Sequence, residues 1–269
     1  MAAPSVGGSG THAAVAAAAR CGLATRGVLY VLVGVLALRI AFGRGGKAAD
    51  RTGALAEIAG HPFGRVLVWA VGAGLVAMAA WRLSEAVYGA AGPEGREPAR
   101  RAVSAARAGF YGVAAFSALS FAAGRGAGRS GDERSRDVTA AALAVPAGQW
   151  LVASAGLAVA VGGVVIAVNA ARFAFREEMD TGGLPRPARR GVDVLGVVGG
   201  VARGAVFTAA GAWLVHAAVS YDPRKAKGVD DTLRSFAQTP AGPWLLVAVA
   251  TGLLLFGAFS WAVAVWRRV

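Results

Sequence analysis

Cysteine and histidine are scarce in this 269-residue sequence, and their scarcity excludes several kinds of site. Cys21 is the only cysteine, so no disulfide can form within the chain, and His12, His61 and His216 lie far apart. Zinc-type metal sites are typically built from Cys/His clusters or from a His-x-x-x-His pair, and neither pattern occurs. We therefore expect no catalytic site, no metal and no cofactor, and we interpret Cys21 as a small buried residue.

Acidic residues are also few, although the chain is strongly apolar. Asp and Glu number 15 against 28 Lys and Arg, which gives a net charge of +13, while 56% of the residues are hydrophobic and the mean hydropathy is +0.53. A soluble domain rarely combines these values, so the charges must be separated from the apolar residues along the chain. The glycine clusters at Gly43 and Gly124 lack the strand, the helix and the Lys-Ser/Thr pair of a phosphate-binding loop.

Six apolar runs of near membrane length separate the charged segments. They cover roughly 27–38 with its flanks, 66–81, 108–124, 150–171, 204–221 and 244–265. A helix needs about 20 apolar residues to cross the hydrocarbon core, and the shorter runs reach that length if Arg39, Arg65 and Arg82 extend to the interface. The last run carries no charge on any face, unlike a soluble amphipathic helix. The predicted fold class is an all-α integral membrane protein with six transmembrane helices.

The chain contains three copies of one two-helix unit. The first helices align as TRGVLYVLVGVLALRIAFG, ARAGFYGVAAFSALSFAAG and ARGAVFTAAGAWLVHAAVS, and each second helix follows a Pro-x-Gly. The aligned residues are Arg26, Arg107 and Arg203, then Pro62, Pro146 and Pro240, then Gly64, Gly148 and Gly242. Because each unit has an even number of spans, all three enter the membrane in the same orientation. This predicts three parallel repeats in a pseudo-threefold bundle.

The predicted units have the following boundaries. A flexible N-terminal segment covers 1–19, and the three repeats, the later two with their linkers, cover 20–92, 93–180 and 181–269. The segments TGALAEIAG and DTLRSFAQT predict short interfacial helices before the second and sixth spans. The corresponding region of the second repeat, 124–137, reads as a mobile loop. Three glycines at spacing four, Gly196, Gly200 and Gly204, favour close helix packing.

The aligned prolines and arginines suggest structural roles first. Proline fits the first position of a helix, where its missing N–H costs nothing, so the Pro-x-Gly pairs are expected to start the even-numbered spans. Seventeen residues follow each arginine before the end of its run, about 25 Å of helix, which places the arginines at one membrane boundary, near the N-termini of their helices. There they could contact lipid headgroups, pair with Glu85 or Asp193, or face a common axis and bind an anionic ligand or lipid.

The distribution of cations gives a weak preference for orientation. Of the 28 Lys and Arg residues, 15 lie on the side with both termini and 13 on the other. By the positive-inside rule both termini are expected in the cytoplasm of a cell whose plasma membrane holds the protein.

Within the first unit, RGVLYVLVGVLAL, GALAEIAGHPFGRVLVWAVGAGL and AAWRLSEA resemble the domain-of-unknown-function 1206 family of actinobacterial membrane proteins. The family is similar in having about three tandem two-helix units. The resemblance extends from Arg20 onward and is weaker in the second repeat. It implies a multi-pass membrane protein and no particular activity.

These observations favour a non-enzymatic scaffold or accessory protein that binds anionic lipid headgroups or a membrane partner, with no nucleic-acid partner. The alternative is a small-solute transporter or channel, although the Pro-x-acid-x-x-basic motif of mitochondrial carriers is absent. An enzyme acting on lipid would need acids gathered at one interface, for which Glu85, Glu177, Glu178 and Asp193 are the candidates. The oligomeric state is not predicted.

Overall fold

Helices account for almost all of the structure, a computed structural model. It describes residues 8–43, 48–60, 64–89, 97–124, 130–179, 185–239 and 241–266. Six of the helices are long and apolar enough to cross a membrane. These are α1 (Gly8–Ala41), α3 (Gly64–Tyr88), α4 (Pro98–Ala122), α6 (Gly148–Ala171), α7 (Arg186–Val219) and α9 (Gly242–Trp266). The predicted all-α membrane fold with six spans is confirmed.

Short helices follow the C-terminal end of each odd-numbered span. They are α2 (Arg51–Ala59), α5 (Gly131–Leu143) and α8 (Val229–Ala237), the last preceded by the 3-10 turn η2 (Pro223–Lys225); a further 3-10 turn, η1 (Ala174–Glu178), follows α6. The interfacial helices predicted before the second and sixth spans correspond to α2 and α8.

The expectation of a loop over 124–137 was wrong in its second half, because α5 begins at Gly131. Its start carries a capping box, in which the Ser130 side chain accepts from the Glu133 N–H and the Glu133 side chain accepts from the Ser130 N–H. This reciprocal pair satisfies two backbone donors that a helix start leaves open. The S-x-x-E pattern was the overlooked signal.

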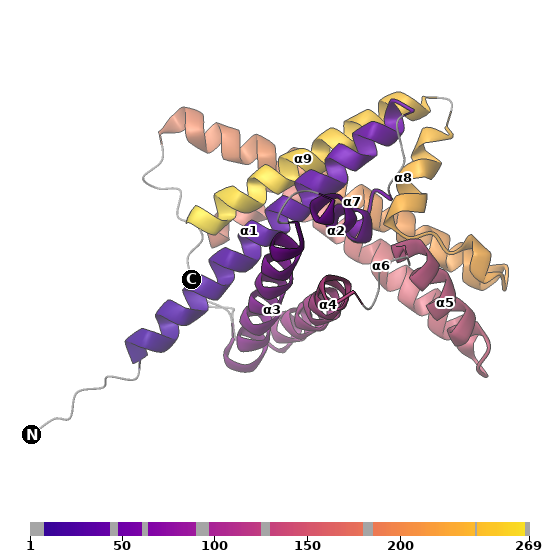
Figure 1. Ribbon diagram of the computed structural model, residues 1–269, viewed down its shortest axis with the longest axis horizontal. Coiled ribbons are helices and arrows are strands. Elements are labelled where there is room, and N and C mark those ends of the chain that lie inside the picture. Colours follow the sequence, from indigo (N-terminus) through magenta and orange to yellow (C-terminus); the bar gives the residue numbers. More distant parts are fainter. Residues whose placement is uncertain are drawn as a thin grey trace, which may run out of the picture.

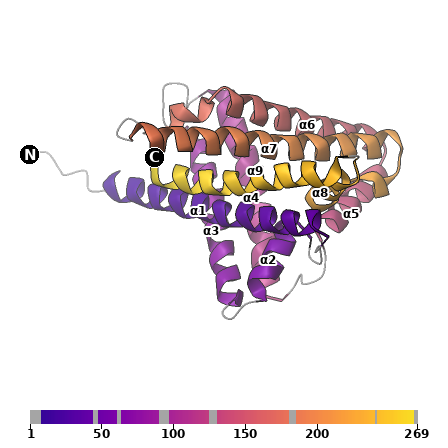
Figure 2. The same ribbon diagram turned by 90° about the horizontal axis from the view of Figure 1, so that it is seen from above.

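The six spans pack in one open row. The contacts run from α6 to α7, then to α9, α1, α3 and α4. Figure 2 shows α6, α7, α9 and α1 side by side, and Figure 1 shows α3 and α4 as a separate pair. In three of these contacts the even-numbered span of one repeat pairs with the odd-numbered span of another: α3 with α4, α6 with α7, and α9 with α1. These contacts between spans of different repeats therefore join the three repeats to one another.

The row does not close between α4 and α6. The two spans pack against each other in the first repeat (α1 with α3) and in the third (α7 with α9), whereas α4 and α6 make little or no contact. The two helices are well separated in Figure 1. The two spans of the second repeat are thus apart, whereas those of the first and third repeats are in contact. The pseudo-threefold symmetry of the bundle stays a prediction.

Glycine allows the closest helix contact, between α6 and α7. A Cβ atom on Gly200 would overlap the Ala170 Cβ, and one on Gly204 would lie 2.6 Å from the Gly163 carbonyl oxygen. Real Cβ atoms do not approach that closely, so any larger residue would push the helices apart. The predicted packing role of these glycines is confirmed.

Apolar side chains cover the outside of the row as well as its interior. Leu23, Leu75 and Leu253 are buried between helices, whereas Trp150 and Trp244 are 77% and 79% exposed at the starts of α6 and α9. Exposed indoles at helix ends suit a membrane interface, where the ring meets lipid and the N–H meets water. Cys21, expected to be buried, is exposed on α1.

Candidate functional site

Two of the aligned arginines meet inside the row of helices. The Arg203 Nε on α7 donates to the Tyr30 hydroxyl on α1 at 2.7 Å, and the Arg26 Nε on α1 donates to the Ser260 Oγ on α9 at 3.1 Å. Both guanidinium groups lie against one aromatic ring, because the Cζ atoms of Arg26 and Arg203 are 5.2 Å and 5.0 Å from the Phe256 centroid. We call Arg26, Tyr30, Arg203, Phe256 and Ser260 the arginine cluster.

Aromatic residues supply most of the remaining surroundings of Arg203. Its Cζ lies 5.7 Å from the ring centroid of Tyr30 and 5.3 Å from that of Phe207. The Tyr30 and Phe256 rings also contact each other edge to face, with centroids 4.7 Å apart. The ring faces carry partial negative charge, so each contact offsets part of the cation's desolvation, by about 0.5–2 kcal/mol.

A third guanidinium, on α3, lies near the cluster but has its own acid. The Arg82 Nη1 donates to the Glu85 Oε2 at 2.6 Å, and the same oxygen accepts from the Ser104 hydroxyl on α4 at 3.3 Å. The side chains of Arg82 and Glu85 are only 6% and 9% exposed. The Tyr111 hydroxyl on α4 interacts electrostatically with Arg26, Arg203 and Arg82. Four spans thus direct polar groups toward one region, and α9 adds Ser260.

The charges of this region do not balance. Glu85 forms its ion pair with Arg82, and Asp193 pairs with Arg176 at 2.6 Å near the start of α7. Over the ranges that the structure describes, Arg26 and Arg203 have hydroxyl and aromatic partners and form no ion pair with a carboxylate. The interpretation that the arginines pair with Glu85 or Asp193 therefore fails for these two. Two part-buried like charges without a carboxylate partner cost free energy, and a bound anion would offset that cost.

The arginines do not lie at helix N-termini as expected. Arg26 lies near the middle of α1, which begins at Gly8, and Arg203 lies near the middle of α7, which begins at Arg186. Both helices begin well before their apolar runs and extend beyond the expected boundary, so the helix dipole has little influence on either arginine. Arg107 is exposed on α4, one turn before Tyr111. The structure brings two of the three predicted arginines together.

The even-numbered spans begin at the glycine of each Pro-x-Gly. The helices α3, α6 and α9 start at Gly64, Gly148 and Gly242. Pro146 lies in the turn two residues before α6, so it does not occupy the first helical position, whereas Pro62 and Pro240 lie outside the described residues. A Cβ on Gly148 would overlap the Ala142 carbonyl oxygen, so the glycine lets the end of α5 approach the start of α6. These residues shape a connection between helices.

The end of the bundle at the C-terminal ends of α1, α4 and α7 carries a second polar region, which sequence reasoning missed. There the acids of the short helices accept hydrogen bonds from the backbone of a different repeat. The Asp50 Oδ2 accepts from the Gly131 N–H at 2.8 Å, the Asp132 Oδ2 from the Asp231 N–H at 3.1 Å, and the Asp230 Oδ1 from the Ala49 N–H at 2.7 Å. Repeat one contacts repeat two, two contacts three, and three contacts one.

We call Asp50, Asp132, Asp230 and Asp231 the aspartate ring. Because free N–H groups at a helix start carry partial positive charge, Asp50 at the start of α5 and Asp132 at the start of α8 are stabilised where they bind. Arginines add to this: Arg234 Nε donates to the Asp230 Oδ2 at 2.8 Å, and Arg136 pairs with the Asp231 Oδ2. The three short helices are thereby joined into one cap on the six spans.

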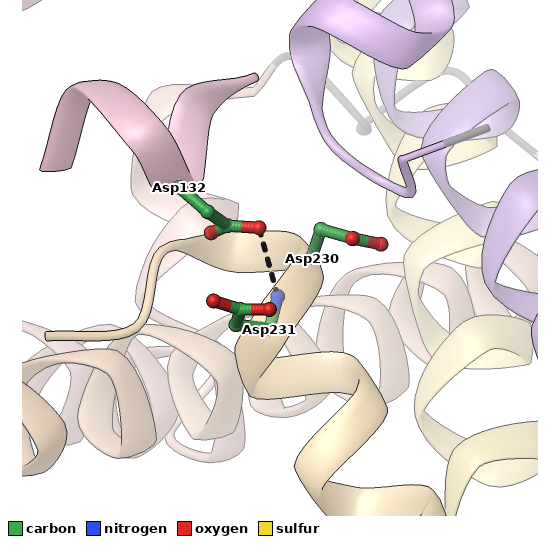
Figure 3. A group of neighbouring side chains, drawn as sticks. All are labelled: Asp132, Asp230 and Asp231. Carbon is green, nitrogen blue, oxygen red and sulfur yellow. Dashed lines mark hydrogen bonds between the residues drawn. The ribbon is translucent and has the colours of Figure 1, made fainter. Parts of the chain in front are cut away.

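Asp132 is the least compensated member of the aspartate ring. The residue is 4% exposed, and its Oδ1 atom has no hydrogen-bond partner within the described ranges. Burial and the nearby Asp231 carboxylate raise the pKa of Asp132 from 3.8 to about 7. In Figure 3 the carboxylates of Asp132 and Asp231 lie one above the other, and the Asp230 side chain points away from them. One oxygen from each of the three acids lies within 4.8 Å of the others.

Comparisons with known proteins agree with the repeat structure. A family model described as Domain of Unknown Function (DUF1206) matches the chain in three segments, 21–89, 102–176 and 198–267. The chain is also 32% identical over 246 residues to a Bacillus subtilis (strain 168) protein described as "Uncharacterized protein YxxB", covering 90% of this chain and 87% of that protein. No solved structure matches. Each matched segment falls inside one expected repeat, and the actinobacterial origin stays a prediction.

Proposed function

Given that the chain belongs to the DUF1206 family, we propose that it is a non-enzymatic membrane scaffold or accessory protein that binds an anionic lipid headgroup at the arginine cluster. The observation that carries this proposal is the pair Arg26 and Arg203, which share the Phe256 ring and form no ion pair with a carboxylate within the described ranges.

The position of the cluster along the helices suits a headgroup. Beyond Arg26, α1 continues to Ala41, and beyond Arg203, α7 continues to Val219. At about 1.5 Å per residue, both arginines lie roughly 22–24 Å from the helix ends beside the aspartate ring, which is most of the way across a hydrocarbon core of about 30 Å. A lipid phosphate on that side of the bilayer is at nearly the same depth, and guanidinium groups bind phosphate oxygens in pairs.

Lipid also has a route to the cluster. Since α4 and α6 make little or no contact, the row of spans is open on the side of the second repeat. Both arginines are only part-buried, so an anion that arrives from this edge can reach their remaining N–H donors. A lipid entering sideways would keep its acyl chains in the bilayer while its phosphate contacts the cluster.

The test is purification in a mild detergent from membranes containing anionic and zwitterionic lipid, followed by native mass spectrometry. We expect one anionic phospholipid retained per chain, and we expect Arg203→Gln to lose it. Arg189→Gln is the matched control, since Arg189 is exposed on the same helix and the charge change is identical. Equal retention of anionic lipid by both variants would reject the lipid proposal.

The same spectra discriminate between this function and the alternative, a small-solute transporter or channel. A retained inorganic or organic anion that is lost in Arg203→Gln would favour transport, because the same two guanidinium groups could hold a solute in transit. A stoichiometric partner protein would favour the scaffold. A monomer carrying only non-selective lipid would count against both functions.

We propose that the protein lies in the plasma membrane and that the side with both termini, which is also the side nearer the arginine cluster, faces the cytoplasm. Support comes from the 15 cations on the side of the termini against 13 on the other. On a Cys21→Ser background, cysteine at position 189 should react with an impermeant maleimide only after permeabilisation, whereas cysteine at position 137 on α5 should react in intact cells. The reverse labelling pattern would show the opposite orientation, and the lipid-binding proposal would not depend on that result.

A further inference from the structure

The carboxylates of Asp132 and Asp231 have unused acceptor capacity at the point where the second and third repeats meet. Asp132 Oδ2 accepts from the Asp231 N–H at 3.1 Å, and Asp231 Oδ2 pairs with Arg136. The other oxygen of Asp132, Oδ1, makes no hydrogen bond within the described part of the chain. Both carboxylates lie on the same side of the start of α8 in Figure 3.

The unpartnered oxygen of Asp132 is enclosed by the protein. The residue is 4% exposed, and a Cβ atom on Gly228 would overlap Asp132 Oδ1, so the loop before α8 closes over this oxygen. Arginine does not compensate it, since the nearby guanidinium groups of Arg136 and Arg234 bond to Asp231 and Asp230. A buried carboxylate oxygen without a donor costs free energy unless a cation or a water contacts it.

We propose that Asp132 and Asp231 hold a hard divalent cation of the Mg²⁺ and Ca²⁺ class, with Asp230 close enough to contribute through a water. Such cations take oxygen ligands, and Mg²⁺ is commonly bound by one or two carboxylates with water completing its shell. One oxygen from each of the three acids lies within 4.8 Å of the others, which is the separation of two ligands across a cation with bonds of about 2.0–2.6 Å.

The cation would fasten α5 to α8. Asp132 belongs to the second repeat and Asp231 to the third, and the spans of the second repeat make little or no contact with each other. A cation shared by the two helices would therefore strengthen the open part of the bundle. This inference concerns the end of the bundle that carries the short helices, away from the arginine cluster, and is independent of lipid binding.

The experiment is a titration of the full chain, purified in detergent and stripped with a chelator, with Mn²⁺ followed by electron paramagnetic resonance. We expect one saturable Mn²⁺ per chain, displaced by Mg²⁺ or Ca²⁺, and whichever displaces it at lower concentration identifies the preferred ion. Asp132→Asn should weaken Mn²⁺ binding at least tenfold. Asparagine keeps an acceptor for the Asp231 N–H, so the contact between α5 and α8 can survive.

Asp137→Asn is the matched control, because Asp137 is exposed on the same helix and loses the same charge; it should bind Mn²⁺ as the unchanged protein does. Circular dichroism and gel filtration check the fold of each variant, and Asp231→Asn replaces Asp132→Asn if the latter does not fold. The absence of saturable Mn²⁺ binding by the unchanged chain would overturn the proposal, as would equal binding by folded Asp132→Asn.

Discussion

The arginine cluster, near the middle of α1 and α7, and the aspartate ring, at one end of the bundle, handle charge in different ways. In the ring, carboxylates accept from backbone N–H groups of other repeats and pair with Arg136 and Arg234, so the protein supplies most of the compensation itself. In the cluster, Arg26 and Arg203 share aromatic and hydroxyl partners. The ring therefore joins the repeats, whereas the cluster holds two cations that form no ion pair with a carboxylate among the described residues.

Replacing Arg203 in the cluster should have the largest effect on the melting temperature, and this effect should occur only where anionic lipid is present. Saturating lipid should stabilise the unchanged protein by about 2.7 kcal/mol at a hundredfold excess over Kd, or roughly 5–10 °C in the apparent melting temperature. Arg203→Met should lose that rise, and in neutral lipid it should melt no lower than the unchanged protein because an uncompensated cation is removed. The control Arg189→Met should keep the lipid-dependent rise in melting temperature. If Arg203→Met keeps it as well, the contrast between the cluster and the ring is contradicted.

Removing Asp50 tests whether the ring joins the repeats. Its Oδ1 accepts from the Gly53 N–H at 2.8 Å as the cap of α2, and its Oδ2 accepts from the Gly131 N–H at 2.8 Å. Asp50→Ala should lower the free energy of unfolding by about 2 kcal/mol, from a lost cap and an unsatisfied donor. Asp222→Ala, which removes the cap of the short turn η2 but no contact between repeats, should lower it by about 1 kcal/mol or less. Denaturant unfolding in detergent measures both, and equal losses would show that Asp50 acts only locally.

The pH dependence of Asp132 tests how completely the ring compensates its acids. Asp231, Asp230 and Asp50 face Asp132 as like charges, while Arg136 and Arg234 bind the other acids. The pKa of Asp132 is raised from 3.8 to about 7, so the folded state binds its proton more tightly than the unfolded state does. The Asp132 contribution should therefore make the protein less stable as pH rises from about 4 to 7, by about 1–2 kcal/mol after screening by nearby water.

Melting temperatures of the unchanged protein and of Asp132→Asn, measured in chelator across that pH range, isolate this contribution. The stability difference between the two should change with pH from about 4 to 7 and level off above 7. A constant difference would mean that Asp132 is compensated as well as the rest of the ring.

The smallest effect is expected from an ion pair outside both regions. Arg39 at the end of α1 pairs with Glu57 on α2 at 3.2 Å, and the Arg39 side chain is 51% exposed. Glu57→Gln should change the free energy of unfolding by no more than about 0.5 kcal/mol, because exposed ion pairs contribute little. A loss comparable with that of Asp50→Ala would show that surface charge, and not the buried ring, holds the short helices.

Much of the fold could be predicted because it follows from local signals. Apolar runs of membrane length fixed the six spans, the aligned arginines and Pro-x-Gly pairs indicated three repeats, and the glycines of α7 indicated close packing. Helix ends were less predictable, since α1 and α7 continue through polar residues beyond the apolar run. The ring was missed because Asp132 and Asp231 are 99 residues apart and only folding brings them together.

The sequence by itself determined the membrane class, the number of spans and the threefold repetition of a two-span unit, because hydrocarbon selects for apolar helices whatever their neighbours are. Only the tertiary structure decided which charges meet. It placed Arg26 and Arg203 on one aromatic ring, left the second repeat open and set Asp132 against Asp231. Such contacts depend on how each helix is rotated and which repeat it packs against, and hydropathy along a single chain contains neither quantity.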